Sequence, residues 1–284
     1  AVRTAIAYDK HHTARGLGGL LQLGRVLRTS RYARVYLPHR SLRSAVLGWL
    51  VGAKEQVGFS GSSGSFLYSR RVPAPAYSHA ADRFLALAGD SGRPRLPWLA
   101  LGERDRSRAH AWLAQRGVQG SFFVLAPGAR WGTKRWPYFP ELANSLDSSC
   151  VVIGASEDAL LGAAIVAAVQ TPGRVFSAAG ELTLRESAAL IERVSLTITN
   201  DSVALHLASA LGRPVVALFG PTVPHFGFGP IGEHESVIEH PALACRPCSA
   251  HGPEVCPLGH HRCMRDIEVA QVVAAASERL QTIR

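Results

Sequence analysis

The sequence predicts an α/β protein built on parallel sheets, because short apolar segments alternate with amphipathic ones along the chain and no hairpin signal joins them. The stretch at 195–219 is the clearest example. Residues 196–199 are alternating and β-branched like a buried strand, 203–211 repeat apolar residues at helical spacing up to Gly212, and 214–219 form a second apolar strand. This order of strand, helix and strand matches one compact βαβ unit.

Length and composition favour a globular protein of two domains. The chain has 284 residues, of which 47% are hydrophobic and 18% are charged, so we expect a packed core rather than disorder. No apolar run reaches the roughly 18 residues that a membrane helix needs. The first residues also lack the apolar core of a signal peptide. We therefore expect a cytoplasmic protein.

The net charge indicates an anionic partner. The formal charge is +10 at neutral pH, which suits a phosphorylated substrate, a membrane surface or a nucleic acid. Most of the excess is arginine, which is scattered along the chain and is suited to bidentate phosphate contacts. No stretch interleaves basic and aromatic residues as a nucleic-acid groove would. We therefore expect no nucleic-acid partner.

The N-terminal part, 1–118, is expected to form the first domain. Arg40, Ser41 and Arg43 surround the start of a predicted helix, where guanidinium and hydroxyl groups could receive a phosphate or a sugar. The alternative is a loop with arginines that face solvent. The predicted strands are 4–8, 33–37 and 55–59, and the predicted helices are 17–27, 42–51, 78–88 and 104–116.

The second domain, 119–284, carries polar residues at three strand ends. Gly128 and Lys134 follow the first strand, Glu157 follows the second, and Asp201 with Ser202 follows a later one. The carboxyl ends of parallel strands share one sheet edge, so these residues could converge on one anionic ligand. The alternative is that Asp201 and Glu157 only stabilise helix starts. The predicted strands are 122–125, 150–153, 175–177, 196–199 and 214–219.

Three segments resemble the ADP-heptose:lipopolysaccharide heptosyltransferases, most nearly those of type II. They are APGARWGTKRWPYFPELA, TNDSVALHLASALGRPVVALFGPT, and a CxPC motif followed by CPLGHHRCM. The resemblance implies a GT-B fold, with two Rossmann-like domains facing a cleft and a terminal helix that crosses between them. It also implies inverting, metal-independent transfer of heptose from ADP-heptose to the lipopolysaccharide inner core, at the cytoplasmic face of the inner membrane.

The same resemblance assigns roles in the C-terminal domain. Lys134 would contact the donor phosphates or the charge that develops on them, and Glu157 would lie near the donor ribose or sugar. Asp201 and Ser202 would bind the donor at a helix N-terminus, and His206 would support that turn. Lys134 and Asp201 are therefore the expected catalytic residues. A cationic lysine suits this chemistry because the leaving group is a diphosphate.

The sequence differs from the family pattern at its beginning. Family members start with a strand and a Gly-Asp loop whose aspartate is thought to be the base, and this chain has no such stretch. We therefore expect the first Rossmann-like domain to be incomplete. Asp9 follows a predicted strand but is not our candidate for the base. The alternative function is an inactive sugar-nucleotide-binding remnant that lacks the base.

The C-terminal cysteines allow two interpretations. Cys245, Cys248, Cys256 and Cys263 could hold a structural zinc ion, because a C-x2-C pair presents two thiolates to one tetrahedral metal. The alternative is a loop of partly buried thiols, since a cytoplasmic protein rarely keeps stable disulfides. No cofactor is expected apart from this zinc. Cys150 lies in an apolar strand and is predicted to be a core residue.

Overall fold

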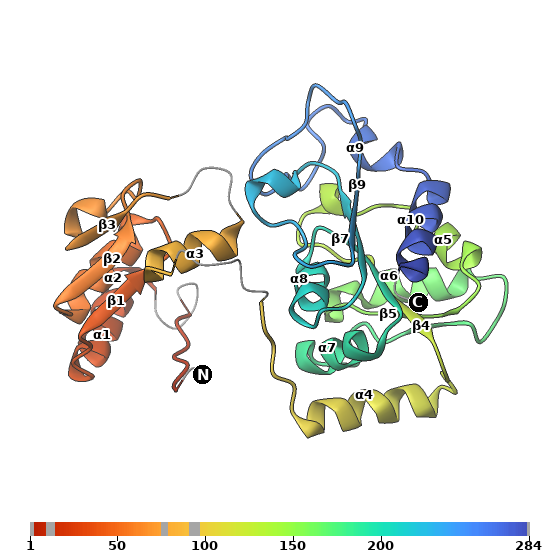
Figure 1. Cartoon of the computed structure of the whole chain (residues 1–284), viewed down its shortest axis with the longest axis horizontal. Helices are drawn as coiled ribbons and strands as arrows, with labels where there is room; N and C mark the ends of the chain where they lie inside the picture. Colours follow the sequence, from red (N-terminus) through yellow and green to blue (C-terminus); the bar gives the residue numbers. More distant parts are fainter. Residues whose placement is uncertain (1–2, 10–14, 75–78, 91–96, 283–284) are drawn as a thin grey trace. The chain divides into compact units, whose positions relative to one another are not determined.

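The computed structural model describes residues 3–9, 15–74, 79–90 and 97–282. It divides into two compact units, Ala1–Pro94 (unit 1) and Arg95–Arg284 (unit 2), and each has its own parallel sheet (Figure 1). This division falls earlier than the predicted boundary at 118 and 119. The reason is the helix α4, Glu103–Gln115, which belongs to unit 2 because its Trp112 is buried in the core there.

Unit 1 contains a three-stranded parallel sheet in the order β1-β2-β3. The predicted strand at 4–8 is wrong, because this segment pairs with no strand and Tyr8 instead contacts Arg43. The third strand lies outside the strands predicted for this domain. The elements are β1 Arg34–Leu37, β2 Glu55–Phe59, β3 Arg70–Val72, α1 Gly16–Thr29, α2 Leu42–Val51, α3 Ala80–Ala88 and a short 3₁₀ helix η1 Ser65–Leu67.

Unit 2 contains a six-stranded parallel sheet in the order β6-β5-β4-β7-β8-β9. The strands are β4 Phe122–Ala126, β5 Ser149–Val152, β6 Val175–Ser177, β7 Leu196–Asn200, β8 Val215–Phe219 and β9 Glu235–Glu239. This is the doubly wound arrangement, in which the chain runs outward from β4 in one direction and from β7 in the other. The adjacent carboxyl ends of β4 and β7 therefore form the topological switch point, where such sheets bind ligands.

Helices cover both faces of the unit 2 sheet. They are α5 Phe139–Ser145, α6 Ala159–Ala167, α7 Leu184–Arg193, α8 Val203–Ala210, α9 Arg262–Arg265 and α10 Val269–Gln281, with 3₁₀ helices η2 Gly132–Lys134, η3 Ser156–Asp158 and η4 Pro224–Phe226. The terminal helix α10 packs on α5 and the unit 2 sheet. Among the described residues, none of the helices has the length and apolar character needed to cross a lipid bilayer.

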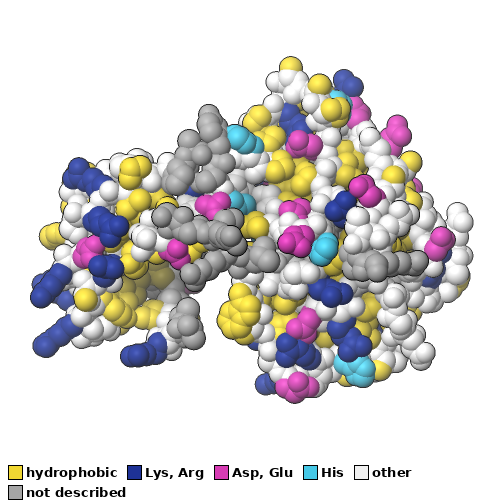
Figure 2. Space-filling view, in the orientation of Figure 1, with side chains coloured by type: hydrophobic (Ala, Val, Ile, Leu, Met, Phe, Trp, Pro, Cys, Tyr) yellow, Lys and Arg dark blue, Asp and Glu magenta, His cyan; other side chains and the backbone are white. Residues whose placement is uncertain are grey.

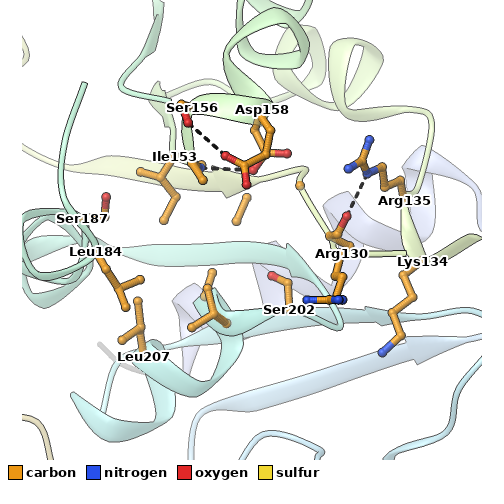
Figure 3. A pocket seen from close by; sticks show the side chains of 18 of the residues that line it. Arg130, Lys134, Arg135, Ile153, Ser156, Asp158, Leu184, Ser187, Ser202 and Leu207 are labelled. Atoms are coloured by element: carbon orange, nitrogen blue, oxygen red, sulfur yellow. Dashed lines mark hydrogen bonds between the residues drawn. The ribbon is translucent and has the colours of Figure 1, made fainter. Parts of the chain in front are cut away.

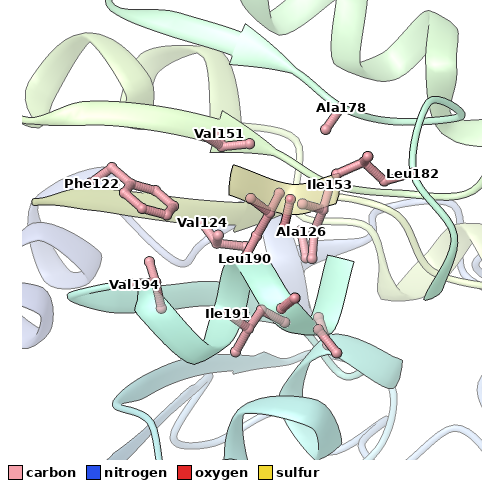
Figure 4. Packing of buried hydrophobic residues seen from close by; sticks show 14 of the residues in the cluster. Phe122, Val124, Ala126, Val151, Ile153, Ala178, Leu182, Leu190, Ile191 and Val194 are labelled. Atoms are coloured by element: carbon pink, nitrogen blue, oxygen red, sulfur yellow. The ribbon is translucent and has the colours of Figure 1, made fainter. Parts of the chain in front are cut away.

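Alternation along the strands divides the core into two layers. Phe122, Val124 and Ala126 of β4 pack with Leu190 and Ile191 of α7 on one face of the sheet (Figure 4). The intervening residues of β4 belong to a second buried cluster, to which α5 and α10 also contribute. Successive side chains of a strand point to opposite faces, so a strand buried on both faces is apolar throughout. Both layers together fix the strand ends that carry the site.

Candidate functional site

The switch point of unit 2 holds a partly buried ion pair. Lys134 ends the short 3₁₀ helix η2 that follows β4, and Asp201 follows β7 directly. Lys134 Nζ lies 2.5 Å from Asp201 Oδ2, and the two side chains are only 13% and 9% exposed. The structure therefore brings together two residues that the sequence placed at different strand ends, and Asp201 does more than stabilise the start of α8.

Two further residues that sequence reasoning missed organise this pair. Thr222 donates a hydrogen bond of 2.7 Å to the same Asp201 oxygen that Lys134 contacts. Asn200 is fully buried, donates to the Pro127 carbonyl at 2.7 Å and accepts from the Trp136 N–H at 3.2 Å. It thereby ties the end of β7 to the loop after β4. A polar side chain that closes an apolar strand was the signal for Asn200, whereas Thr222 lies in the turn after β8 and had no such signal.

A cavity of about 890 Å³ opens beside the ion pair. Figure 3 shows that it has two chemically different ends. Arg130, Lys134 and Arg135 gather at one end, whereas the apolar side chains of Ile153, Leu184 and Leu207 lie at the other. A ligand with an anionic part and an apolar ring system would match both ends. Such a polarity is typical of a nucleotide.

Gly128 lines this cavity, but for a different reason than the sequence suggested. A Cβ atom at Gly128 would lie 2.5 Å from the Asp158 carboxylate, so glycine is required by that side chain. Asp158 in turn accepts a hydrogen bond of 3.1 Å from the Ala155 N–H. The loops after β4 and β5 are thereby packed together at the cavity wall, and Asp158 is a site residue that the sequence analysis did not single out.

Glu157 lies exposed at the cavity wall as an ionised carboxylate. A hydrogen bond from its own backbone N–H and one from the Ser156 hydroxyl, at 3.0 Å, hold the pKa of Glu157 below its usual range. An ionised carboxylate accepts hydrogen bonds and donates none, so it suits the hydroxyl groups of a ribose or sugar.

The N-terminus of α8 opens onto the same cavity. Ser202 stands at the N-cap position, yet its side chain makes no capping hydrogen bond, and its hydroxyl lies 3.1 Å from that of Thr199. Val203 and Ala204 of the first turn line the cavity with it. The unsatisfied N–H groups and the positive end of the helix dipole favour an anion at this position.

A second, smaller cavity of about 420 Å³ shares Lys134, Asp201 and Ser202 with the first. His206 lines this second cavity and not the first, together with aromatic and polar neighbours. These are Thr222, Phe226, Phe228 and His251. The ion pair therefore stands between two cavities, and a ligand that fills both would place its central part over Lys134 and Asp201.

The three unit 1 candidates each have a structural contact. Ser41 caps α2, where its hydroxyl accepts from the Ser44 N–H at 3.3 Å. The Arg43 guanidinium donates to the Tyr8 hydroxyl, and the exposed Arg40 stacks 5.2 Å from the centre of the Phe59 ring. The structure thus brings these residues together at one helix start, with Arg40 the most open to a ligand.

The four C-terminal cysteines are free thiols. Across the described part of the chain, no group of three or more His, Cys, Asp or Glu side chains is arranged to hold a metal ion, so the structure gives no support to the possible zinc site. Burial raises the pKa of Cys263 to about 11, and that of the core residue Cys150 to about 12. Both therefore remain protonated thiols near neutral pH.

A doubly wound sheet with a cationic, two-ended cavity at its switch point is typical of nucleotide-binding α/β proteins. The family model for glycosyltransferase family 9 (heptosyltransferase) matches residues 20–256. The chain belongs to this family and is a glycosyltransferase. The predicted family and the predicted α/β fold class are confirmed.

Curated relatives agree with this assignment. Lipopolysaccharide heptosyltransferase 2 of Escherichia coli is 32% identical over 79% of this chain and 70% of its own length. Lipooligosaccharide heptosyltransferase 2 of Haemophilus influenzae is 28% identical over 98% of this chain and 85% of its own length. The similarity thus extends over both units.

Solved structures show the same fold. The ADP-heptose lipopolysaccharide heptosyltransferase II of E. coli has a TM-score of 0.75 and 28% identity, covering 94% of this chain and 82% of that one. A family 9 glycosyltransferase from Veillonella parvula has a TM-score of 0.84 and 23% identity, covering 98% and 82%. The second similarity concerns the fold alone.

Proposed function

We propose that this protein transfers heptose from ADP-heptose to the inner core of lipopolysaccharide, with inversion and without an essential metal ion. The observation that carries the proposal is the Lys134–Asp201 pair at the cationic end of a two-ended cavity. The name of the similar E. coli structure supplies the ADP-heptose donor, and the names of the curated relatives supply heptose transfer to lipopolysaccharide or lipooligosaccharide. An inactive remnant receives no support, because the chain matches relatives named as heptosyltransferases over most of their length.

The donor would lie across the switch point. Its diphosphate would contact Lys134 and the N-terminus of α8, and its adenine would occupy the apolar end near Leu184 and Leu207. Glu157 would accept hydrogen bonds from the ribose. The heptose would then extend past Ser202 toward the second cavity and His206. Gly128 serves this site indirectly, by admitting Asp158 into the wall.

Lys134 and Asp201 would act on the leaving group. As the acceptor hydroxyl attacks the anomeric carbon, the bond from that carbon to the phosphate oxygen breaks and its electron pair remains on ADP. The ammonium group of Lys134 and the N–H groups of α8 would stabilise the growing negative charge. Asp201 holds Lys134 in place before the donor arrives. These two residues are therefore the proposed catalytic groups.

Unit 1 would receive the anionic acceptor. Residues 1–94 contain 14 lysines and arginines against four aspartates and glutamates, a net charge of +10, whereas residues 95–284 contain 17 of each. The whole net charge of the protein therefore lies in unit 1, where Figure 2 shows basic side chains spread over the visible face. Arg40, Ser41 and Arg43 are the proposed acceptor contacts.

The same charge supports a location at the inner membrane. Anionic lipids attract basic surface groups by about 1 kcal/mol per lysine or arginine. We infer that the enzyme works at the cytoplasmic surface of this membrane, where its lipid-linked acceptor would be presented.

Calorimetric titration with ADP, UDP and GDP tests the donor. Selective binding of ADP is the expected result, followed by transfer of heptose from ADP-heptose to a lipopolysaccharide lacking that heptose. Equal binding of the three nucleotides would contradict the donor class. ADP binding without any transfer would retain the donor site and overturn the proposed acceptor.

A further inference from the structure

One segment of unit 2 lies against Lys134 and against the turn whose Thr222 contacts Asp201. This segment, residues 246–261, follows β9 and carries two of the four C-terminal cysteines, Cys248 and Cys256; we refer to it as the strap. Gly252 sits at its centre with φ of 79°. A Cβ atom there would lie 3.4 Å from Lys134 Cε and 3.0 Å from Pro221 Cγ. The strap therefore touches the lysine on one side and the turn after β8 on the other.

The strap fixes the turn that carries Lys134. His261 Nε2 lies 2.7 Å from the carbonyl oxygen of Thr133, the residue before the lysine. A carbonyl oxygen can only accept, so Nε2 carries the proton of this hydrogen bond. The Thr133 hydroxyl donates in turn to the Pro253 carbonyl. A Cβ atom at Gly132 would lie 2.7 Å from the Glu254 carbonyl oxygen, so the backbones are in close contact.

The same strap fixes the turn that holds Asp201. The Arg246 side chain is only 7% exposed and donates to the carbonyls of Gly220 and Thr222 at 2.5 and 3.0 Å. It also pairs with Glu239 of β9 at 2.6 Å. This anchors the turn from which the Thr222 hydroxyl reaches Asp201.

The backbone of His261, whose side chain contacts the Thr133 carbonyl, has an unusual conformation. Its φ is 49°, in the left-handed region that is uncommon for residues other than glycine, although histidine adopts it more often than most. Such residues persist only where the surrounding structure holds them, and they are frequent at functional sites. The η2 turn has only three residues and little stability of its own, so its position depends on contacts of this kind.

We propose that His261 and Arg246 are positioning residues of this enzyme: through Thr133 and Thr222, the strap sets the distance between Lys134 and Asp201 and thereby the strength with which the site holds a nucleoside diphosphate. The proposal rests on the proposed function for the identity of the ligand. Displacing a charged group by about 1 Å can lower catalysis as much as 100-fold, so contacts behind the lysine affect the site without touching the ligand.

The test measures ADP affinity by calorimetry in His261→Ala, His261→Gln, Lys134→Ala and the double variant Lys134→Ala with His261→Ala. His261→Ala is expected to weaken ADP binding about 10-fold. His261→Gln retains a donor near the position of Nε2 and is expected to recover most of the affinity. In the Lys134→Ala background, His261→Ala should cause no further loss, because the two residues act through one contact. His110→Ala, on the exposed face of α4, is the matched control and should bind like the wild type.

The outcomes separate this proposal from the proposed function. Equal losses from His261→Ala in both backgrounds, or a Gln variant as weak as the Ala variant, would mean that His261 only supports folding. Wild-type affinity in His261→Ala would overturn the positioning role outright. Should His261→Ala fail to fold, the Gln variant with and without Lys134 decides the question. If the wild type binds UDP or GDP instead of ADP, the donor assignment fails while the same comparison, made with that nucleotide, still tests the strap.

Discussion

The two units differ in how each could recognise an anion. Unit 2 is electrically neutral in sum, yet it concentrates a partly buried lysine and aspartate at one strand edge and fixes them with Thr222, Asn200 and the strap. Unit 1 carries the entire net charge of +10, and its arginines are mostly exposed. A small ligand of defined shape suits the first arrangement, and an extended anionic surface suits the second.

The two cores match this difference. The six-stranded sheet of unit 2 has a large buried cluster on each face. The described part of unit 1 has a three-stranded sheet and small clusters around Leu37 and Val57. Holding two charged groups in register requires rigid surroundings, whereas attraction through net charge does not. The predictions below are ordered by the size of the expected effect and test this contrast.

Lys134→Ala should have the largest effect. Removing the lysine leaves the Asp201 carboxylate buried and uncompensated beside the diphosphate, so turnover should fall by roughly 100- to 1000-fold. The free energy of unfolding should fall by about 3 kcal/mol. Transfer kinetics and denaturant unfolding measure the two changes. Arg116→Ala, which breaks a more exposed ion pair with Glu181, is the control. A variant that unfolds completely would show that Lys134 is mainly structural.

Thr222→Val should weaken donor use about 10-fold, because Asp201 loses a hydrogen bond to a charged group worth about 1.5–3 kcal/mol. Thr222→Ser keeps the hydroxyl and should stay close to the wild type. Steady-state kinetics with ADP-heptose compare the three proteins. If the Val and Ser variants behave alike, the hydroxyl has no role in holding Asp201.

Arg40→Ala should change unit 1 more modestly. Binding to vesicles that contain phosphatidylglycerol should weaken about fivefold, the effect of about 1 kcal/mol for one basic group. Salt near 1 M, where the Debye length is about 3 Å, should abolish vesicle binding and reduce ADP binding far less. Vesicle sedimentation measures the first quantity and calorimetry the second. Equal salt sensitivity of both would remove the contrast between the units.

The smallest of these effects is expected from low pH, which should weaken the ion pairs of helix α4. Arg185 and the Gly102 N–H hold the pKa of Asp105 below its usual range, and Arg106 does the same for Glu192. These carboxyl groups have a lower pKa in the folded state than in the unfolded state, where it is near 4, so their ionisation stabilises the fold above about pH 4. This stabilisation is lost as the pH falls through the pKa of the folded state. The melting temperature should therefore decline below about pH 4, and less steeply in Asp105→Asn. An unchanged slope in that variant would contradict the assignment to Asp105.

Much of the fold could be predicted because its signals are local. The strand, helix and strand at 195–219 correspond to β7, α8 and β8, and the predicted segment at 122–125 corresponds to β4. Some elements, β3 among them, were misjudged for non-local reasons. Residues 4–8 have a strand-like pattern but pair with nothing, and β9 exists because β8 offers it a parallel edge.

The sequence by itself determined the α/β class, the family, and the position of Gly128, Lys134, Glu157, Asp201 and Ser202 at strand ends, because periodicity and short motifs are carried by neighbouring residues. Only the tertiary structure decided which of these groups meet. It joined Lys134 to Asp201 across 67 positions, moved His206 to a second cavity, and explained Gly128 through Asp158. It also placed the strap behind the pair. These relations depend on the strand order 6-5-4-7-8-9, which sets distances that no local pattern records.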